Sequence, residues 1–182
     1  MKVKNTLSTI LLFVLCSCIS TAPSGNLPFS TIESARDLTG TYRNKGITGE
    51  GYPSVYLSKI IWREDKAIVH EEIDAISVVE LSPGLLEVKA LPITETSKVS
   101  HFKEDKDFEI QNGRIILENE SGIAGFKADE PLVGPYYGRR ELGLDASGHG
   151  KYKSSFSVAG LVYLVIPIAM GGTDEVRFEK QK

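Results

Sequence analysis

The sequence has little cysteine and no excess of basic residues, and each shortage excludes a class of protein. Only two of its 182 residues are cysteines, Cys16 and Cys18, and both lie near the N-terminus. A disulfide framework is therefore not indicated, and an exported domain would depend on its hydrophobic core. The chain carries 21 basic and 24 acidic residues, for a net charge of −3. This balance lacks the positive charge of a nucleic-acid-binding protein, and there is no polybasic cluster for attachment to anionic lipid.

Signatures of catalysis and metal binding are missing as well. The three histidines, His70, His101 and His149, do not have the spacing of a zinc site, so we predict no metal and no cofactor. No Gly-x-Ser-x-Gly sequence presents a nucleophilic serine. Ser147 and Asp145 lie near His149, but near neighbours on one turn rarely face one another as nucleophilic catalysis requires. We therefore expect a protein that is not an enzyme.

The N-terminus carries the most specific motif in the chain. Lys2 and Lys4 precede the apolar run Leu7–Leu15, which is too short to span a bilayer as a helix but is typical of a signal-peptide core. The run ends in Leu15-Cys16-Ser17-Cys18, which resembles the lipobox of bacterial lipoproteins. The resemblance implies that residues 1–17 are a signal peptide and that the Cys18 thiol becomes a diacylglyceryl thioether. The alternative is an ordinary secretory signal with two incidental cysteines.

The same resemblance implies a location. Neither Ile19 nor Ser20 is the aspartate that marks retention of many lipoproteins at the inner membrane. We therefore expect a lipid anchor on Cys18 in the outer membrane, facing the periplasm, if the source is Gram-negative. Residues 18–30 are rich in small residues, Pro and Gly, and we expect them to form a flexible lipidated tether. Removal of residues 1–17 takes away two lysines, so the mature chain has 19 basic and 24 acidic residues, net −5.

From residue 31 onward most signals favour β-strands. Leu86, Val88 and Ala90 alternate with charged residues, which is typical of a strand with one buried face. The turn sequence Ser82-Pro83-Gly84 precedes them, so residues 73–91 are predicted to form a hairpin.

The clearest predicted hairpin is centred on Asn112-Gly113, which suits a type I′ turn because both central positions need positive φ. This turn places Ile110 opposite Ile115 and Phe108 opposite Leu117. Both apolar pairs then fall on one face, as a half-buried sheet requires.

The C-terminal part contains a long uncharged segment, Val158–Met170. It is too short for a membrane helix and contains Pro167. We predict a central strand covered on both faces, followed by a turn at Met170–Thr173 and a last strand at Asp174–Lys180. Asp introduced at Leu164 or at Val165 is then expected to prevent folding or cost several kcal/mol.

Two segments interrupt the β pattern. A capping box over Ser30–Glu33 predicts a short helical turn that continues through Arg36. Leu57–Trp62 fits either a helical turn or a strand. Together the patterns predict one mainly β domain over residues 31–182, an antiparallel meander of about eight to ten strands that forms a barrel or a sandwich.

A second, shorter resemblance concerns the first strand. Gly40-Thr41-Tyr42 is similar to the opening Gly-x-Trp of lipocalin-like (calycin) proteins, with tyrosine in place of tryptophan. The resemblance implies a β-barrel that binds a small ligand, and Arg177 as the basic residue that packs over the aromatic ring.

The most site-like cluster is Tyr136, Tyr137, Arg139 and Arg140. Two aromatic rings and two guanidinium groups suit an anionic or sugar ligand at a pocket mouth. The alternative is that the tyrosines pack at a loop-to-strand junction while the arginines coat a sheet edge. We expect a lipid-anchored envelope protein that binds a small apolar or amphipathic ligand; the alternative is a structural or assembly lipoprotein that docks onto another envelope protein.

Overall fold

Strands in two sheets make up most of the computed structural model, which describes residues 15–92, 98–124 and 132–181. One sheet has the order β1-β10-β9-β8-β7-β6 and the other the order β11-β2-β3-β4-β5. The fold is therefore mainly β and sandwich-like, as expected, but it is not a closed barrel. The strands are β1 (Leu15–Thr21), β2 (Gly40–Arg43), β3 (Ala75–Ser82), β4 (Leu85–Leu91), β5 (Val99–Lys103), β6 (Glu109–Gln111), β7 (Arg114–Ala124), β8 (Leu132–Leu144), β9 (Gly150–Val162), β10 (Ile166–Phe178) and β11 (Lys180–Gln181). The helices are α1 (Leu57–Ile61) and the 3-10 helices η1 (Ala35–Leu38) and η2 (His70–Glu72).

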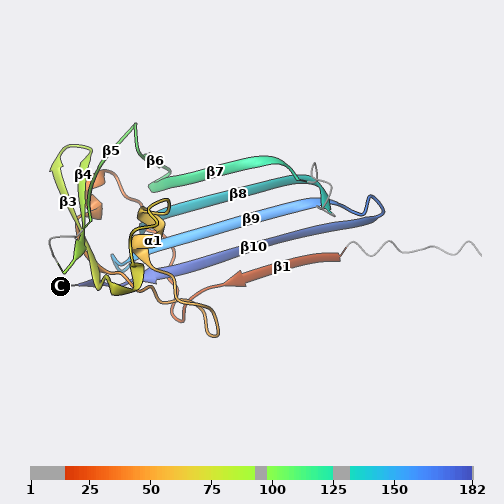
Figure 1. Ribbon diagram of the computed structural model, residues 1–182, viewed down its shortest axis with the longest axis horizontal. Coiled ribbons are helices and arrows are strands. Elements are labelled where there is room, and N and C mark those ends of the chain that lie inside the picture. The colour runs from red at the N-terminus through yellow and green to blue at the C-terminus, as the bar shows by residue number, and fades with distance from the viewer. Residues whose placement is uncertain (1–14, 93–97, 125–131, 182) are drawn as a thin grey trace, which may run out of the picture.

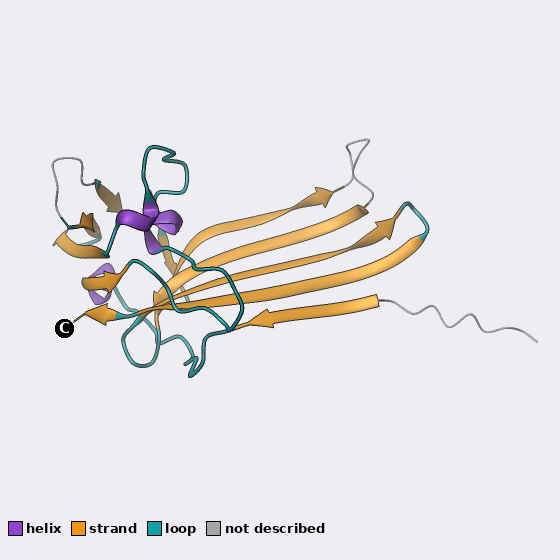
Figure 2. Ribbon diagram, turned by 60° about the horizontal axis from the view of Figure 1, so that its bottom comes forward, coloured by secondary structure: helices purple, strands orange, loops and turns teal. Residues whose placement is uncertain are grey.

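The two sheets differ greatly in length. Strands β7 to β10 run well past the small sheet and the helices, so one half of the long sheet projects away from the rest of the molecule (Figure 1; Figure 2). Residues 119–124, 132–138, 155–162 and 166–173 form this projecting half, which we call the distal sheet.

The core lies where the proximal half of the long sheet faces the small sheet. Val176 is 3% exposed and Phe178 is 0% exposed, and both point inward from β10. The predicted alternation on β4 is confirmed, because Leu86, Val88 and Ala90 are all buried. Burial of apolar area at about 25 cal/mol per Å² is the main stabilising term for such a core.

A buried asparagine holds α1 in place beside this core. The Asn44 side chain is fully buried and donates to the carbonyl oxygens of His70 (2.7 Å) and Ile73 (2.9 Å). Its Oδ1 accepts from the Ser58 amide at 2.7 Å, in the first turn of α1. Since an unpaired buried amide is costly, this network fixes α1 and η2 relative to β2.

Both predicted hairpins are present. β3 and β4 pair around Pro83-Gly84. In the second hairpin Asn112 and Gly113 have φ of 53° and 73°, and Ile110 lies opposite Ile115, as expected.

The predicted ladder pair of Phe108 with Leu117 does not form, although the register of β6 on β7 is the predicted one. Strand β6 begins at Glu109, and a register shift on β7 lies between Ile116 and Glu118. Phe108 is buried and Leu117 is 40% exposed, although both line the space between the two sheets. The apolar pattern alone does not reveal the β-bulge that interrupts the pairing of β7 with β8 at Leu117.

The predicted central strand at Val158–Met170 is also wrong. This segment is a hairpin made of the end of β9, a tight turn and the start of β10, and Met170–Thr173 is continuous strand. Leu164 is 69% and Val165 76% exposed, so aspartate at either position would bury no charge. An uncharged run carries no alternation to mark where one strand ends and the next begins, which is why the sequence pattern misplaced the turn.

Gly172 explains why a glycine pair stands inside β10 without forming a turn. A Cβ at Gly172 would come within 2.5 Å of the Phe156 ring, which lies opposite it on β9. Glycine here therefore makes room for a cross-strand aromatic ring.

The segment predicted to be a flexible tether is held against the long sheet. β1 pairs in parallel with β10, and Thr21 Oγ1 donates to Asp174 Oδ1 at 2.7 Å. Farther along, Phe29 forms a β-bridge with Asp145. The boundary predicted for the signal peptide, between residues 17 and 18, falls inside β1.

The two predicted interruptions of the β pattern are helical. A capping box is present, but it joins Ser34 and Asp37 and caps η1, so the turn begins four residues later than predicted. The ambiguous segment Leu57–Trp62 forms α1, with Trp62 as its C-cap.

The basic residue over the Tyr42 ring is not the predicted one. Lys180 Nζ lies 5.5 Å from the centre of the Tyr42 ring. Arg177 follows Val176 and precedes Phe178, which both point into the core, so Arg177 faces the opposite side of β10.

Candidate functional site

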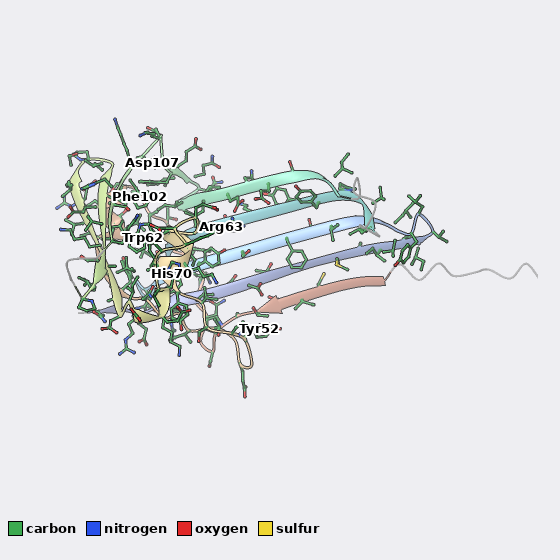
Figure 3. All side chains as sticks on the ribbon, in the orientation of Figure 1. Tyr52, Trp62, Arg63, His70, Phe102 and Asp107 are labelled. Carbon is green, nitrogen blue, oxygen red and sulfur yellow. The ribbon has the colours of Figure 1, made fainter. Side chains whose placement is uncertain are left out.

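A cavity of about 980 Å³ lies between the two sheets, and α1 forms part of its wall. Strands of both sheets supply its deep lining, which is apolar and almost fully buried, with Tyr42, Val78, Val88, Val176 and Phe178 among its residues. The helix side adds half-buried residues such as Ile60 and Ile61. In Figure 3, Trp62 and Phe102, which also line the cavity, lie at the small-sheet end, and Arg63 lies beside the base of the long strands.

Charged residues gather where the lining becomes exposed. Glu118 on β7 binds Arg63 Nη1 at 2.9 Å and Arg140 Nη1 at 2.6 Å. Arg140 lies opposite Ser154 on β9, which lies opposite Asp174 on β10. Cross-strand register therefore places a polar row across the long sheet, at the boundary between the cavity and the distal sheet.

Two of the tyrosines that line the cavity, Tyr42 and Tyr152, stay neutral over an extended pH range. Burial raises the pKa of Tyr42 to about 12, and its hydroxyl donates to the Leu38 carbonyl oxygen at 2.8 Å. Burial also raises the pKa of Tyr152. Both raised values follow from the cost of placing a phenolate in a low-dielectric environment. The deep cavity is thus apolar and uncharged, and its charged lining residues lie where the lining is exposed or half-buried.

A separate polar network lies on the opposite face of the long sheet. Lys151 Nζ is buried and contacts Glu175 Oε2 at 2.6 Å and Asn26 Oδ1 at 2.8 Å. Burial raises the pKa of Glu175, but hydrogen bonds from Lys151 and Asn26 outweigh it and lower the pKa overall. This network holds the N-terminal segment and does not face the cavity.

The structure does not bring the four predicted ligand-binding residues together. They follow one another along β8, so Tyr136 and Arg140 face the cavity side while Tyr137 and Arg139 face the opposite side. Only Arg140 lines the cavity. On the other face Arg139 Nε lies 3.1 Å from Glu141 Oε1. The cavity residues come from many segments without characteristic spacing, and the sequence offered no signal for them beyond their apolar character.

The histidines take structural positions. His149 Nδ1 accepts from the Lys180 amide at 3.0 Å, and Asp145 Oδ1 accepts from the amides of Ser147 and His149 instead of facing an imidazole. His70 Nδ1 lies 3.0 Å from Ser58 Oγ. Within residues 15–92, 98–124 and 132–181, no three His, Cys, Asp or Glu side chains are grouped to hold a metal ion.

No protein-family model, curated protein or solved structure matches this chain. In the part of the chain that the structure describes, no helix has the length and apolar character needed to cross a membrane.

Proposed function

We propose that the protein is a lipid-anchored protein of the bacterial cell envelope that binds a small apolar or amphipathic molecule between its two sheets. The inter-sheet cavity carries the proposal, because its volume of about 980 Å³ falls in the range of small-molecule sites and its deep lining is apolar. Protein interiors usually leave few voids larger than a water molecule. An apolar ligand would supply the van der Waals contacts that the lining side chains lack.

The charges at one end of the cavity favour an amphipathic ligand. Arg63 and Arg140 share a single carboxylate, Glu118. An anionic group at this end would accept hydrogen bonds from either guanidinium, while the apolar part of the ligand fills the deep cavity. Long-chain carboxylic acids and anionic lipids have this chemistry.

The N-terminal motif supports the anchor. Leu15-Cys16-Ser17-Cys18 fits the lipobox pattern, and Cys18 is a free, exposed cysteine on β1. The acyl groups would hold the domain at the membrane, and the cavity would act beside it. This function requires no catalytic step.

The test is to identify what the cavity holds. Lipids that co-purify with the intact protein are identified by mass spectrometry, and affinity is measured with a dansyl-labelled fatty acid. Ile60→Trp adds bulk to the cavity wall and should weaken probe binding about tenfold or more. Val79→Trp is the matched control, because Val79 is 41% exposed on β3 and lies outside the cavity.

The charged end is tested separately. Arg140→Gln should weaken binding of the fatty-acid probe but leave binding of the corresponding uncharged alcohol unchanged. Equal affinity of Ile60→Trp and the parent for the probe would contradict a ligand in the cavity. Equal affinity of Arg140→Gln and the parent for the acid would contradict only the placement of the anionic group.

A second candidate is docking onto another envelope protein, and the open edge of β7 favours it. Among the described residues β6 pairs only with Arg114–Ile116, so the edge of β7 beyond Glu118 is free to accept an added strand. A photoreactive residue at Asn119 should then crosslink to a specific envelope protein. Crosslinking only to lipid would remove this candidate.

A further inference from the structure

The turn between β9 and β10 presents a cluster of large apolar side chains to solvent. Tyr163, Leu164, Val165 and Ile166 are 75%, 69%, 76% and 51% exposed, and we call these four residues the tip. The tip lies at the far end of the distal sheet, away from the cavity and the small sheet (Figure 1). Isolated exposed apolar residues are common, but a contiguous group at the end of a projecting hairpin marks a contact surface.

Turn geometry does not account for these side chains. Tyr163 and Leu164, the central residues of the turn, have φ of +50° and +59°. Asn and Gly are the residues that such a turn favours, and both also suit a turn that faces water. The chain uses Asn and Gly in this way at Asn112-Gly113. Two bulky apolar residues at the same kind of turn therefore cost conformational stability and solubility, which points to a role in contact with an apolar partner.

The distal parts of β8, β9 and β10, behind the tip, carry no charged residue. No Asp, Glu, Lys or Arg occurs in residues 132–138 of β8, in residues 154–162 of β9, or in residues 166–173 of β10. The nearest charged residues on these strands, such as Arg139, Lys153 and Asp174, lie toward the cavity end. Glu120 on β7 is the one charged residue of the distal sheet as described, and it lies on the strand farthest across the sheet from β10. A protein partner commonly meets a polar rim around an apolar centre, whereas β8, β9 and β10 offer only apolar and uncharged groups next to the tip.

The position of the proposed lipid anchor favours lipid as the partner. Cys18, the residue proposed to carry the lipid, pairs with Gly171 in the distal sheet, which is the half of the long sheet that ends in the tip. The segment proposed to reach the membrane therefore leaves the sheet at the same end as the tip (Figure 1). We propose that the tip inserts into the hydrocarbon of the bilayer that holds the N-terminus.

The depth of insertion is limited by the sheet itself. Hydrocarbon offers no hydrogen-bond partners, so the open edge of β7 has to remain outside it. Only the tip and the residues next to it enter the hydrocarbon, and the distal sheet holds the cavity end of the molecule above the membrane surface. This inference stands on the exposed tip and the uncharged distal parts of β8 to β10, and its choice of lipid rests on the proposed anchor at Cys18; it does not depend on a ligand in the cavity.

The experiment measures the depth of a label at the tip. Full-length protein carrying Cys16→Ser and Leu164→Cys is labelled with an NBD fluorophore and reconstituted into vesicles of phosphatidylcholine and phosphatidylglycerol that contain nitroxide-labelled acyl chains. The emission should shift to the blue, and the nitroxide chains should quench it. A label at Lys106→Cys, an exposed position on the β5–β6 connection, should show neither effect. The Cys16→Ser chain without an added cysteine gives the background from Cys18.

A second pair of variants separates insertion from folding. The double variant Leu164→Asp, Val165→Asp should keep the parent's thermal midpoint, because both side chains are exposed. In this double variant a fluorophore at Tyr163→Cys should no longer be quenched by the nitroxide-labelled acyl chains, because aspartate is costly to place in hydrocarbon. Val79→Asp with Leu81→Asp changes two exposed apolar residues of the small sheet and should leave the same label quenched. A tip label that aqueous iodide quenches as strongly as the Lys106→Cys label overturns the proposal. A label shielded from iodide but untouched by the nitroxide chains also overturns it, because a protein then covers the tip.

Discussion

Tyr42 is the residue at which burial most clearly changes the chemistry of a side chain. It is 4% exposed, and its pKa is raised to about 12 from the ordinary 10.0. In the folded state the phenol therefore keeps its proton at pH values where the unfolded chain loses it. Below pH 10 this preference contributes fully to stability, and it is lost as the pH rises toward about 12.

We predict that Tyr42→Phe reduces the loss of stability at alkaline pH. A difference of about two pKa units corresponds to at most 2–3 kcal/mol, and about half of it should be lost by pH 11. At neutral pH the variant should lose about 1 kcal/mol with the Tyr42–Leu38 hydrogen bond. The measurement is urea unfolding of parent and variant at pH 8 and pH 11.

Tyr52→Phe is the matched control for this prediction, because Tyr52 is 49% exposed (Figure 3). The free energy of unfolding of the Tyr52→Phe control should equal that of the parent at both pH values. If Tyr42→Phe also loses as much stability between them as the parent does, burial of the phenol is not what opposes its ionisation.

At the scale of elements, the sequence predicted correctly the turns and strands that are determined by residues close together in the chain. The turn at Asn112-Gly113 and the alternation of β4 depend on neighbouring residues, and both are confirmed. The pairing of β1 with β10 joins segments about 150 residues apart, and nothing local indicates it. Of the predicted site cluster only Arg140 lines the cavity, because strand alternation sends its neighbour Arg139 to the other face.

The uncharged C-terminal segment was misjudged for a different reason. The prediction assumed that such a run has to be buried in the domain, and on that assumption Leu164 and Val165 were core residues. In the structure both side chains are exposed. Their apolar character therefore indicates contact with a partner and not packing in the core of the domain.

We predict that Gly113→Val destabilises the domain by about 1–3 kcal/mol. Gly113 has a φ of +73°, which a β-branched residue adopts poorly. A Cβ at this position would also come within 2.6 Å of the Thr31 Cγ2 atom, and the Gly113 carbonyl oxygen accepts from the Ile32 amide. The thermal midpoint of the variant should therefore fall by several degrees.

Gly148→Val is a useful comparison, because Gly148 has a φ of +81° but open space around its Cα. The variant therefore isolates the cost of the backbone conformation. If the thermal midpoints of Gly113→Val and Gly148→Val fall by the same amount, contact with Thr31 does not contribute to the destabilisation.

At the scale of the whole molecule, the proposed ligand site and the proposed membrane contact lie at opposite ends of the long sheet. The cavity and its charged end lie where the sheets face one another, and the tip and the first described residues of β1 lie at the opposite end. Cleavage before Cys18 would remove Leu15–Ser17 from β1 and leave Cys18–Thr21 paired with β10. The mature N-terminus would then still follow the long sheet, which would orient the cavity away from the membrane.

The anchor itself is tested by chemistry that the tip does not influence. We predict that cells grown with labelled palmitate incorporate the label into the parent and into Cys16→Ser, but not into Cys18→Ser, because Cys18 takes the position of the acylated cysteine in the proposed lipobox. The Cys18→Ser chain should keep residues 1–17, which intact-mass measurement detects directly. Label in Cys18→Ser, or its loss in Cys16→Ser, would contradict the assignment of the acylated residue. Absence of label from the parent would contradict the lipoprotein proposal, while leaving lipid quenching of the tip as a separate result. If the parent is acylated in a Gram-negative host, density fractionation should place it in the outer membrane, because neither Ile19 nor Ser20 is an inner-membrane retention signal.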